Sequence, residues 1–168
     1  AIIPGSELVC HFGEAAEAAE KIGYPILLKA AAGGGGKGMK IVRKSEDLRT
    51  VFEEASAEAL SAFGDDRIYV EHYIPNARHI EVQIIGDRFG NVIHLFERDC
   101  SLQRRYQKMV EEAPSSAVSP ELREDICQTA VRIVKHIGYE NAGTIEFLLD
   151  QDTDRFYFLE MNTRIQVE

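Results

Sequence analysis

The segment Lys29-Ala-Ala-Ala-Gly-Gly-Gly-Gly-Lys-Gly-Met39 places five glycines within six positions, between two apolar runs. The flanking runs, Tyr24-Pro-Ile-Leu-Leu-Lys29 and Met39-Lys-Ile-Val-Arg43, both have the composition of strands. Each ordered glycine costs roughly 0.5–1 kcal/mol of chain entropy relative to alanine, so the loop is unfavourable unless its backbone approaches a ligand closely. Backbone N–H groups with a nearby lysine typically bind phosphate oxygens. We therefore predict a phosphate-binding glycine loop in a hairpin, with a flexible linker as the alternative.

The composition of the 168 residues is that of a soluble globular protein, with 45% hydrophobic and 28% charged residues. The net charge of −9 argues against a nucleic-acid partner, which would require a basic face. Three cysteines without CxxC spacing indicate neither a zinc site nor a disulfide framework. No apolar run approaches the roughly 18 residues of a membrane span, and no signal peptide opens the chain. We expect a cytoplasmic protein with no nucleic-acid and no membrane partner.

The residues around the glycine loop predict a first domain over residues 1–74. The segment His11–Ile22 is rich in alanine and glutamate and is followed by Gly23, a typical end of a helix. A second helix is expected from Ser45, because apolar residues recur at helical spacing until Gly64. The predicted order is helix, strand, glycine loop, strand and helix.

The rest of the chain, residues 75–168, predicts a strand-rich second domain with one helix. Polar and apolar side chains alternate along residues 79–85, which predicts a half-buried strand. The polar face of this strand carries His79, Glu81 and Gln83. Pro120 is suited to the first position of a helix, and residues 143–149 and 155–161 predict a final hairpin. The fold class is therefore α+β.

The final hairpin carries a candidate metal site. By the two-residue period of a strand, Glu160 and Asn162 share one face, and Glu146 lies on the neighbouring strand. Two carboxylates about 4 Å apart repel by roughly 4 kcal/mol at an effective dielectric constant near 20. A hard cation such as Mg²⁺ reverses that sign. The alternative is that both glutamates face solvent on an amphipathic strand.

A second polar cluster extends over residues 97–112. It is either a solvated charged surface or part of a site that contains Gln103 and Lys108. Cationic and amide donors beside an acidic metal site suit a phosphate or bicarbonate oxyanion.

Four segments of the chain, in this order, together resemble biotin carboxylase, the ATP-grasp component of acetyl-CoA, propionyl-CoA, methylcrotonyl-CoA and pyruvate carboxylases. They are Lys29 with Gly33–Met39, Glu97-Arg-Asp-Cys-Ser-Leu-Gln-Arg-Arg105, Glu111-Glu-Ala-Pro114 and Glu160-Met-Asn-Thr-Arg-Ile-Gln-Val-Glu168. The resemblance covers residues 3–168. It implies an ATP-grasp fold fragment, with a glycine-rich lid lobe over residues 1–74 and part of the antiparallel-sheet catalytic lobe over residues 75–168.

The resemblance implies that the chain binds ATP. Lys29 would contact the phosphates under a lid formed by Gly35 and Gly36, residues 71–74 would meet the adenine, and His79 would contact the ribose region. The full implied ATP-binding set is Lys29, Gly35, Gly36, Glu71, His72, Tyr73, Ile74, His79, Gln103, Tyr106, Glu146 and Glu160. Tyr106 stands where many relatives carry histidine, so this sequence departs from the family there.

The resemblance also implies the metal and the chemistry. Magnesium, or manganese in its place, would be held by Glu146, Glu160 and Asn162. Bicarbonate would be bound by Lys108, Arg164, Gln166 and Val167. Glu168 would be the base that deprotonates bicarbonate, and the implied catalytic set is Arg164, Glu168 and Lys108. Bicarbonate would attack the γ-phosphate of ATP to give carboxyphosphate, and biotin would be the carboxyl acceptor.

Partners follow from the same resemblance. A biotin carboxyl carrier domain or protein and a carboxyltransferase component are expected, in a homo-oligomeric parent enzyme of the cytoplasm, or of the mitochondrial matrix if the parent is eukaryotic. The alternatives are another ATP-grasp ligase, such as a half of carbamoyl-phosphate synthase, and a non-catalytic nucleotide-binding module.

The chain opens at Ala1 without methionine and ends at Glu168, within a motif. The family has an ATP-binding lysine upstream and a biotin-proximal arginine downstream, so we expect the 168-residue piece alone to be inactive. We also expect some apolar faces of the second lobe to lack part of their cover, namely those of Ile80, Val82, Ile84, Phe147 and Leu149.

Overall fold

The computed structural model describes residues 1–34, 36–104 and 107–166. The chain divides into two compact units, the first of which comprises Ile3–Ile74. The second unit comprises Pro75–Glu168 together with Ala1–Ile2. The first residues belong to it because Ile2 forms a parallel bridge with Phe158.

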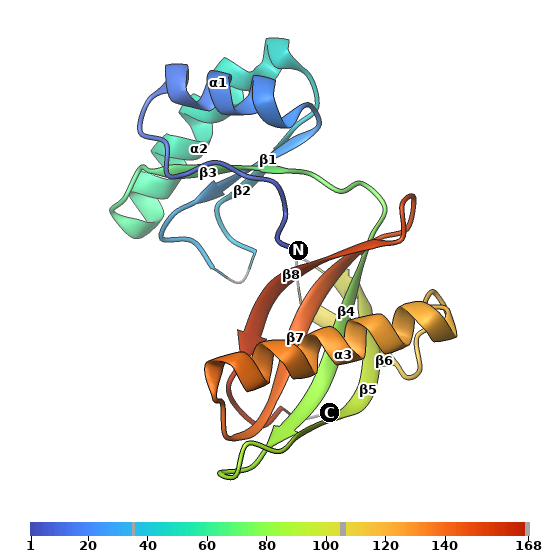
Figure 1. Ribbon diagram of the computed structural model, residues 1–168. Helices are drawn as coiled ribbons and strands as arrows, with labels where there is room; N and C mark the ends of the chain where they lie inside the picture. The colour runs from blue at the N-terminus through green and yellow to red at the C-terminus, as the bar shows by residue number, and fades with distance from the viewer. Residues whose placement is uncertain (35, 105–106, 167–168) are drawn as a thin grey trace. The chain divides into compact units, whose positions relative to one another are not determined.

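The first unit is a three-stranded sheet with two helices on it (Figure 1). Its elements are α1 (Phe12–Ile22), β1 (Ile26–Ala30), β2 (Met39–Val42), the 3-10 helix η1 (Ser45–Asp47), α2 (Leu48–Phe63) and β3 (Ile68–His72). The strand order is β2-β1-β3, and both pairs are antiparallel. Ala15 and Ala19, one helical turn apart on α1, are fully buried in the core of this unit. The sequence predicted both helices, but it did not predict that β3 completes this sheet.

The glycine loop joins two antiparallel strands, as predicted, with Lys29 opposite Met39. The backbone of Gly38 has a φ of +74°, and its carbonyl accepts a hydrogen bond from Ala30 N at 2.8 Å. A Cβ atom at this position would lie 2.7 Å from Ala30 Cβ. Glycine is therefore required here both by the backbone conformation and by the close packing of the two strands.

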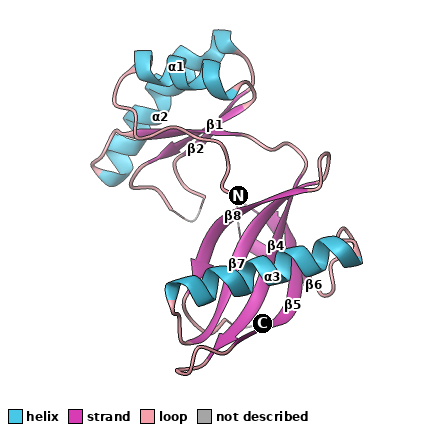
Figure 2. Ribbon diagram, viewed as in Figure 1, coloured by secondary structure: helices cyan, strands magenta, loops and turns pink. Residues whose placement is uncertain are grey.

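The second unit is a five-stranded antiparallel sheet with one long helix packed on one face (Figure 2). Its elements are β4 (Ala77–Gly86), β5 (Val92–Arg104), β6 (Gln107–Glu112), α3 (Pro120–Ile137), β7 (Asn141–Asp150) and β8 (Arg155–Asn162). The strand order is β6-β5-β4-β7-β8. Helix α3 begins as predicted, since Ser119 Oγ accepts from Leu122 N at 3.2 Å and Pro120 is the first helical residue. The α+β class is confirmed.

The core between the sheet and α3 is closed. The side chains expected to lack cover are at most 1% exposed: Ile80, Val82, Ile84, Phe147 and Leu149. That expectation was wrong, because Ile126, Ala130 and Val134 of α3 pack against this face of the sheet. Strand β5 continues through the charged residues up to Arg104. Among the described residues, no helix combines the length and the apolar character that a membrane span requires.

Candidate functional site

A row of charged residues crosses the sheet of the second unit. In the register of the strands, Arg98 on β5 is opposite Glu81 on β4, and Glu81 is opposite Glu146 on β7. Glu146 is in turn opposite Glu160 on β8. Residues opposite each other in a sheet project from the same face, so these four side chains share one face. It is the face opposite to α3, because Ile80, next to Glu81, points into the core.

Lys108 neutralises two carboxylates of this row. Its Nζ donates to Glu146 Oε1 at 2.8 Å and also to Glu81 Oε2. Burial lowers the pKa of Lys108, but its hydrogen bonds to Glu146 and Glu81 outweigh that effect and raise the pKa above its ordinary value. The ammonium group therefore stays charged and offsets the repulsion between the two glutamates, which at about 4 Å would be roughly 4 kcal/mol.

Asn162 and Arg164 extend the network at the other side of Glu146. Asn162 Nδ2 donates to Glu146 Oε1 at 2.9 Å, and Arg164 Nη1 donates to Asn162 Oδ1 at 2.7 Å. The side chain of Glu160 is exposed, and it has no hydrogen-bond or ion-pair partner within the described ranges. The three predicted metal ligands thus lie on one hairpin, and two carboxylates with an amide oxygen are the hard donors that suit Mg²⁺.

Glu81 and Arg98 belong to this site, although neither was predicted to be functional. Arg98 Nε donates to Glu81 Oε1 at 2.7 Å, and Arg98 Nη2 lies 3.5 Å from Oε1 of the predicted bicarbonate ligand Gln166. The sequence contained a signal for this role of Glu81, which lies within the predicted strand of residues 79–85 and not at its end. A carboxylate buried in an inner strand needs a cation beside it.

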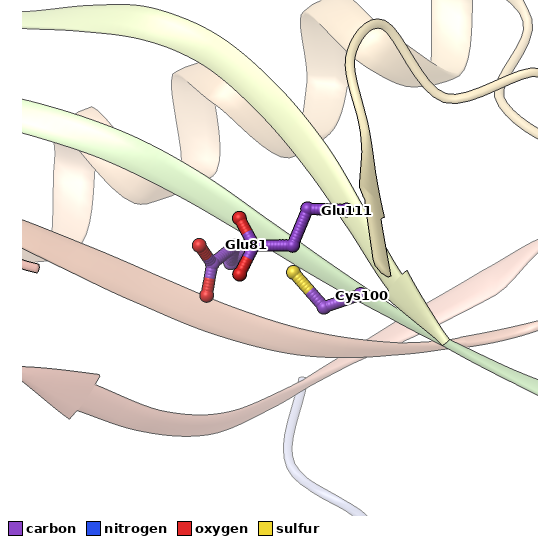
Figure 3. Close-up of side chains that lie close together, drawn as sticks. All are labelled: Glu81, Cys100 and Glu111. Carbon is purple, nitrogen blue, oxygen red and sulfur yellow. The ribbon is translucent and has the colours of Figure 1, made fainter. Parts of the chain in front are cut away.

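Figure 3 shows the side chains of Glu81, Cys100 and Glu111 close together. They come from β4, β5 and β6, and their ligand atoms lie within 4.8 Å of one another. Burial raises the pKa of the Cys100 thiol to about 12, so the sulfur is protonated at neutral pH. Glu81 already binds Arg98 and Lys108, and Glu111 Oε2 lies 3.5 Å from Arg98 Nε. We therefore assign these carboxylates to the protein's own cations and not to a metal ion.

Two further predicted residues lie beside the row. Gln103 is opposite Lys108 across β5 and β6, and its Nε2 donates to the carbonyl oxygen of Cys100 at 3.0 Å. His79 precedes Glu81 by two residues on β4 and donates from its backbone N–H to Ser101 Oγ at 2.9 Å. Burial lowers the pKa of His79, which makes the imidazole neutral at pH 7.

In the first unit, the structure brings together Lys29 and Glu71, both predicted to contact ATP. Lys29 Nζ donates to both carboxylate oxygens of Glu71, at 3.0 and 3.1 Å. Both side chains are partly exposed, at 31% and 22%. They are diagonal neighbours on β1 and β3, since Leu27 is the residue opposite Glu71. Gly36, predicted to cover the phosphates, has a φ of +80°.

The residues after Glu71, predicted to meet the adenine, have part of their backbone engaged. The N–H groups of His72 and Tyr73 donate to the carbonyls of Pro4 and Pro25, at 2.8 and 3.0 Å. The side chain of Ile74 is buried. These two amides therefore serve the fold of the first unit. Four residues with predicted roles lie outside the described residues: Gly35, Tyr106, Val167 and Glu168.

The sequence and the structure both match known proteins. Residues 1–168 match the family model of the carbamoyl-phosphate synthase L chain, ATP binding domain. Pyruvate carboxylase of Bacillus subtilis is 54% identical over 168 residues, which are 99% of this chain and 14% of that protein.

Two solved structures are similar over 99% of this chain and 37% of their own. One is biotin carboxylase of Campylobacter jejuni in a βγ-ATP complex, with 54% identity and a TM-score of 0.89. The other is the biotin carboxylase domain dimer of 2-oxoglutarate carboxylase from Hydrogenobacter thermophilus, with magnesium ADP, ADP and bicarbonate, at 52% identity and a TM-score of 0.88. The chain thus spans about a third of the length of these structures. The resemblance to biotin carboxylase is confirmed, and the chain belongs to the carbamoyl-phosphate synthase L chain ATP-binding domain family, with the ATP-grasp fold.

Proposed function

We propose that this chain is part of a biotin carboxylase, a ligase that uses ATP and bicarbonate to carboxylate biotin. The observation that carries the proposal is the arrangement around Glu146. A candidate metal site of acidic and amide oxygens adjoins two cationic side chains, since Lys108 donates to Glu146 and Arg164 donates to Asn162. Phosphoryl transfer from a metal-bound nucleotide to an anion requires those two kinds of group side by side.

Glu146, Glu160 and Asn162 would hold Mg²⁺, or Mn²⁺ in its place. When bound, the ion would neutralise charge on the phosphates of ATP. The chain's own contribution is to fix the donors: Glu146 and Glu160 are cross-strand partners, and Glu146 also accepts a hydrogen bond from Asn162 Nδ2.

Bicarbonate would bind to Lys108, Arg164, Gln166 and Val167. The guanidinium of Arg164 offers paired donors that match a planar carbonate-like anion. An oxygen of bicarbonate would attack the γ-phosphorus of ATP, and ADP would leave. Glu168 would accept the proton of bicarbonate in this step, and the product would be carboxyphosphate. That intermediate would break into CO₂ and phosphate, the phosphate would take the proton of the biotin ureido nitrogen, and this nitrogen would attack CO₂.

The proposed nucleotide contacts divide between the two units. In the first unit, Lys29, Gly35 and Gly36 would bind the phosphates of ATP, and residues 71–74 would bind the adenine. Lys29 is paired with Glu71, so each side chain orients the other. The carboxylate of Glu71 also competes with phosphate for the ammonium group of Lys29 and so weakens the attraction between Lys29 and phosphate. The proposed contacts in the second unit are His79, Gln103 and Tyr106, together with the metal ligands.

The proposed surroundings follow those of the carboxylases that the chain matches. A biotin carboxyl carrier domain or protein would deliver biotin, a carboxyltransferase component would use the product, and the parent enzyme would be a homo-oligomer. We place it in the cytoplasm, or in the mitochondrial matrix if the parent is eukaryotic.

The test is ADP release by the complete enzyme with ATP and Mg²⁺, in the presence and absence of bicarbonate and free biotin. We expect ADP release that requires bicarbonate, and transfer of radiolabelled bicarbonate to biotin. The family description favours one second candidate, a carbamoyl-phosphate synthase-like ligase. That enzyme would use ammonia and not biotin as the acceptor. A non-catalytic module would bind ATP without releasing ADP.

A further inference from the structure

We propose that Arg98 is a positioning residue for bicarbonate, which orients Gln166 directly and Lys108 through Glu81. The inference rests on the proposed function and deepens it, because it names the residue that holds two of the proposed bicarbonate ligands in place. Arg98 itself has no proposed contact with a substrate.

Arg98 lies at the β5 end of the row of charged residues, opposite Glu81. Its side chain is 16% exposed, and that of its cross-strand partner Glu81 is 1% exposed. Removing two opposite charges from water is unfavourable unless further hydrogen bonds satisfy them. Here they are satisfied, so the pair has a single geometry in which the guanidinium can act as a template.

The guanidinium contacts four side chains, two of them on β4, one on β6 and one in the segment after β8. Nε donates to Glu81 Oε1 at 2.7 Å, and Nη1 and Nη2 donate to Gln83 Oε1 at 3.1 and 3.2 Å. Nη2 also lies 3.5 Å from Gln166 Oε1, and Nε lies 3.5 Å from Glu111 Oε2. The donors of arginine form a rigid planar fork, so the bonds to Glu81 and Gln83 on β4 also fix the position of Nη2, the nitrogen that faces Gln166.

The contact with Gln166 decides which end of its amide meets an anion. A glutamine amide has an acceptor oxygen and a donor nitrogen on opposite sides. Because Arg98 approaches Oε1, the Nε2 donors of Gln166 point away from the guanidinium, as binding of an anion requires. This contact is the longest of the set, and hydrogen bonds of active sites often shorten when the substrate binds.

The contact with Glu81 positions the second ligand. Arg98 occupies Oε1 of that carboxylate, and Lys108 Nζ binds Oε2. The ammonium group of Lys108 is thus located by a glutamate that Arg98 holds in turn. Gln83 anchors the arrangement to the neighbouring strand, since its Nε2 donates to the carbonyl oxygen of Gly143 on β7 at 3.0 Å.

The experiment replaces Arg98 in the complete enzyme by lysine. The single ammonium of Arg98→Lys retains a charge for Glu81 but cannot reach Gln83 and Gln166 as well. We expect the KM for bicarbonate in ADP release to rise about tenfold or more, the effect of losing one charge-assisted hydrogen bond. The KM for magnesium ATP stays within about twofold, because none of the four side chains that Arg98 contacts is a proposed ligand of the metal or the nucleotide.

Arg123→Lys is the matched control on the other face of the sheet. Arg123 Nε also donates to a buried glutamate, Glu97 Oε1, at 2.7 Å, and its side chain is 21% exposed. Its remaining partners are the carbonyls of Ser115 and Val118, and it contacts no proposed substrate ligand within the described part of the chain. Both variants weaken a comparable buried ion pair. If Arg98 only stabilised the fold, the two variants would therefore change the KM for bicarbonate equally.

A rise in the bicarbonate KM confined to Arg98→Lys supports the inference. An equal rise in both variants, or none in Arg98→Lys, overturns it. If Arg98→Lys does not fold, Gln83→Leu decides, because it frees one side of the guanidinium and leaves the bond to Glu81; an unchanged bicarbonate KM in that variant overturns the inference. A wild-type enzyme whose ADP release ignores bicarbonate overturns the proposed function itself, and is recognised before any variant is compared.

Discussion

Glu81 and Glu146 are cross-strand partners whose carboxylates share one cation, the ammonium group of Lys108. The shared cation explains how two like charges can face each other in the middle of a sheet, where such a pair is otherwise destabilising. It also joins the two halves of the proposed site. Glu146 Oε1 accepts from Lys108, a proposed bicarbonate ligand, and from Asn162, a proposed metal ligand.

The first prediction is that Lys108→Met lowers both stability and activity. Without the ammonium group, the carboxylates of Glu81 and Glu146 face each other directly, and leaving a buried charge unpaired typically costs about 3–5 kcal/mol. We expect a lower midpoint of thermal unfolding, together with loss of bicarbonate-dependent ADP release.

The double variant Lys108→Met/Glu146→Gln separates the two effects. Glu81 keeps its pairing with Arg98, and Glu146→Gln removes the charge that loses its cation, so the unfolding midpoint should recover. ADP release should stay low, because a proposed bicarbonate ligand and a proposed metal ligand are missing. A double variant as unstable as the sum of its single changes would show that charge sharing is not what Lys108 contributes to stability.

The second prediction concerns the metal. Glu160 is exposed and has no partner among the described residues, so Glu160→Gln should leave folding unchanged. The Mg²⁺ concentration for half-maximal ADP release should rise by about tenfold or more, since even outer-shell partners of metal ligands contribute 10–100-fold to affinity. Glu140→Gln, an exposed glutamate just before β7, is the control. Equal Mg²⁺ titrations for the two variants would contradict the assignment of Glu160.

The hairpin that carries the proposed metal ligands could be predicted, because a strand has a strict two-residue period. Placing Glu160 and Asn162 on one face, beside Glu146, needed only the alternation of side chains and a short turn. The structure has this pairing, and Glu146 is opposite Glu160. The irregularity that follows, between Glu146 and Phe147, could not be predicted, since a bulge depends on how the neighbouring strands bend.

The pairing of strands that are distant in the sequence could not be predicted, because local sequence patterns do not contain it. Glu81 meets Glu146 only because β4 lies between β5 and β7, and Arg98 meets Glu81 only because β5 continues through its charged residues. A run of charged residues is typical of a solvated surface. That some of these residues are buried can be recognised only when the strand opposite them is known. For the same reason the closed core under α3 was missed: Ile126 is far from β4 in the sequence and covers it in space.

The third prediction concerns pH. Burial holds the pKa of His79 below the ordinary value of 6.5. As the pH falls through 6.5, the unfolded chain binds a proton that the folded chain does not, so folding stability decreases from about pH 6.5 down to the lowered pKa of the folded state. The midpoint of thermal unfolding, measured without nucleotide from pH 7.5 to 5.5, should fall less in His79→Gln than in the wild type. His136→Gln, at an exposed position of α3, should keep the wild-type slope. Parallel curves for all three proteins would rule out a role of His79 in this pH dependence.

The last prediction tests the glycine loop, by comparing Gly38→Ala with Gly34→Ala. At Gly38 the φ of +74° lies in the left-handed region, which is unfavourable by roughly 1–2 kcal/mol for a residue with a Cβ. The new Cβ would also lie 2.7 Å from Ala30 Cβ and 3.1 Å from the ring of Phe63. At Gly34 a Cβ would meet nothing within 4 Å, so alanine is accommodated there.

The readout is hydrogen exchange of the Ala30 amide, which donates to the carbonyl of Gly38. A loss of 1–2 kcal/mol in the opening free energy of the hairpin speeds its exchange by about 5–30-fold in Gly38→Ala. Exchange in Gly34→Ala should match the wild type, and equal rates in the two variants would mean that the conformation of Gly38 does not hold the hairpin together.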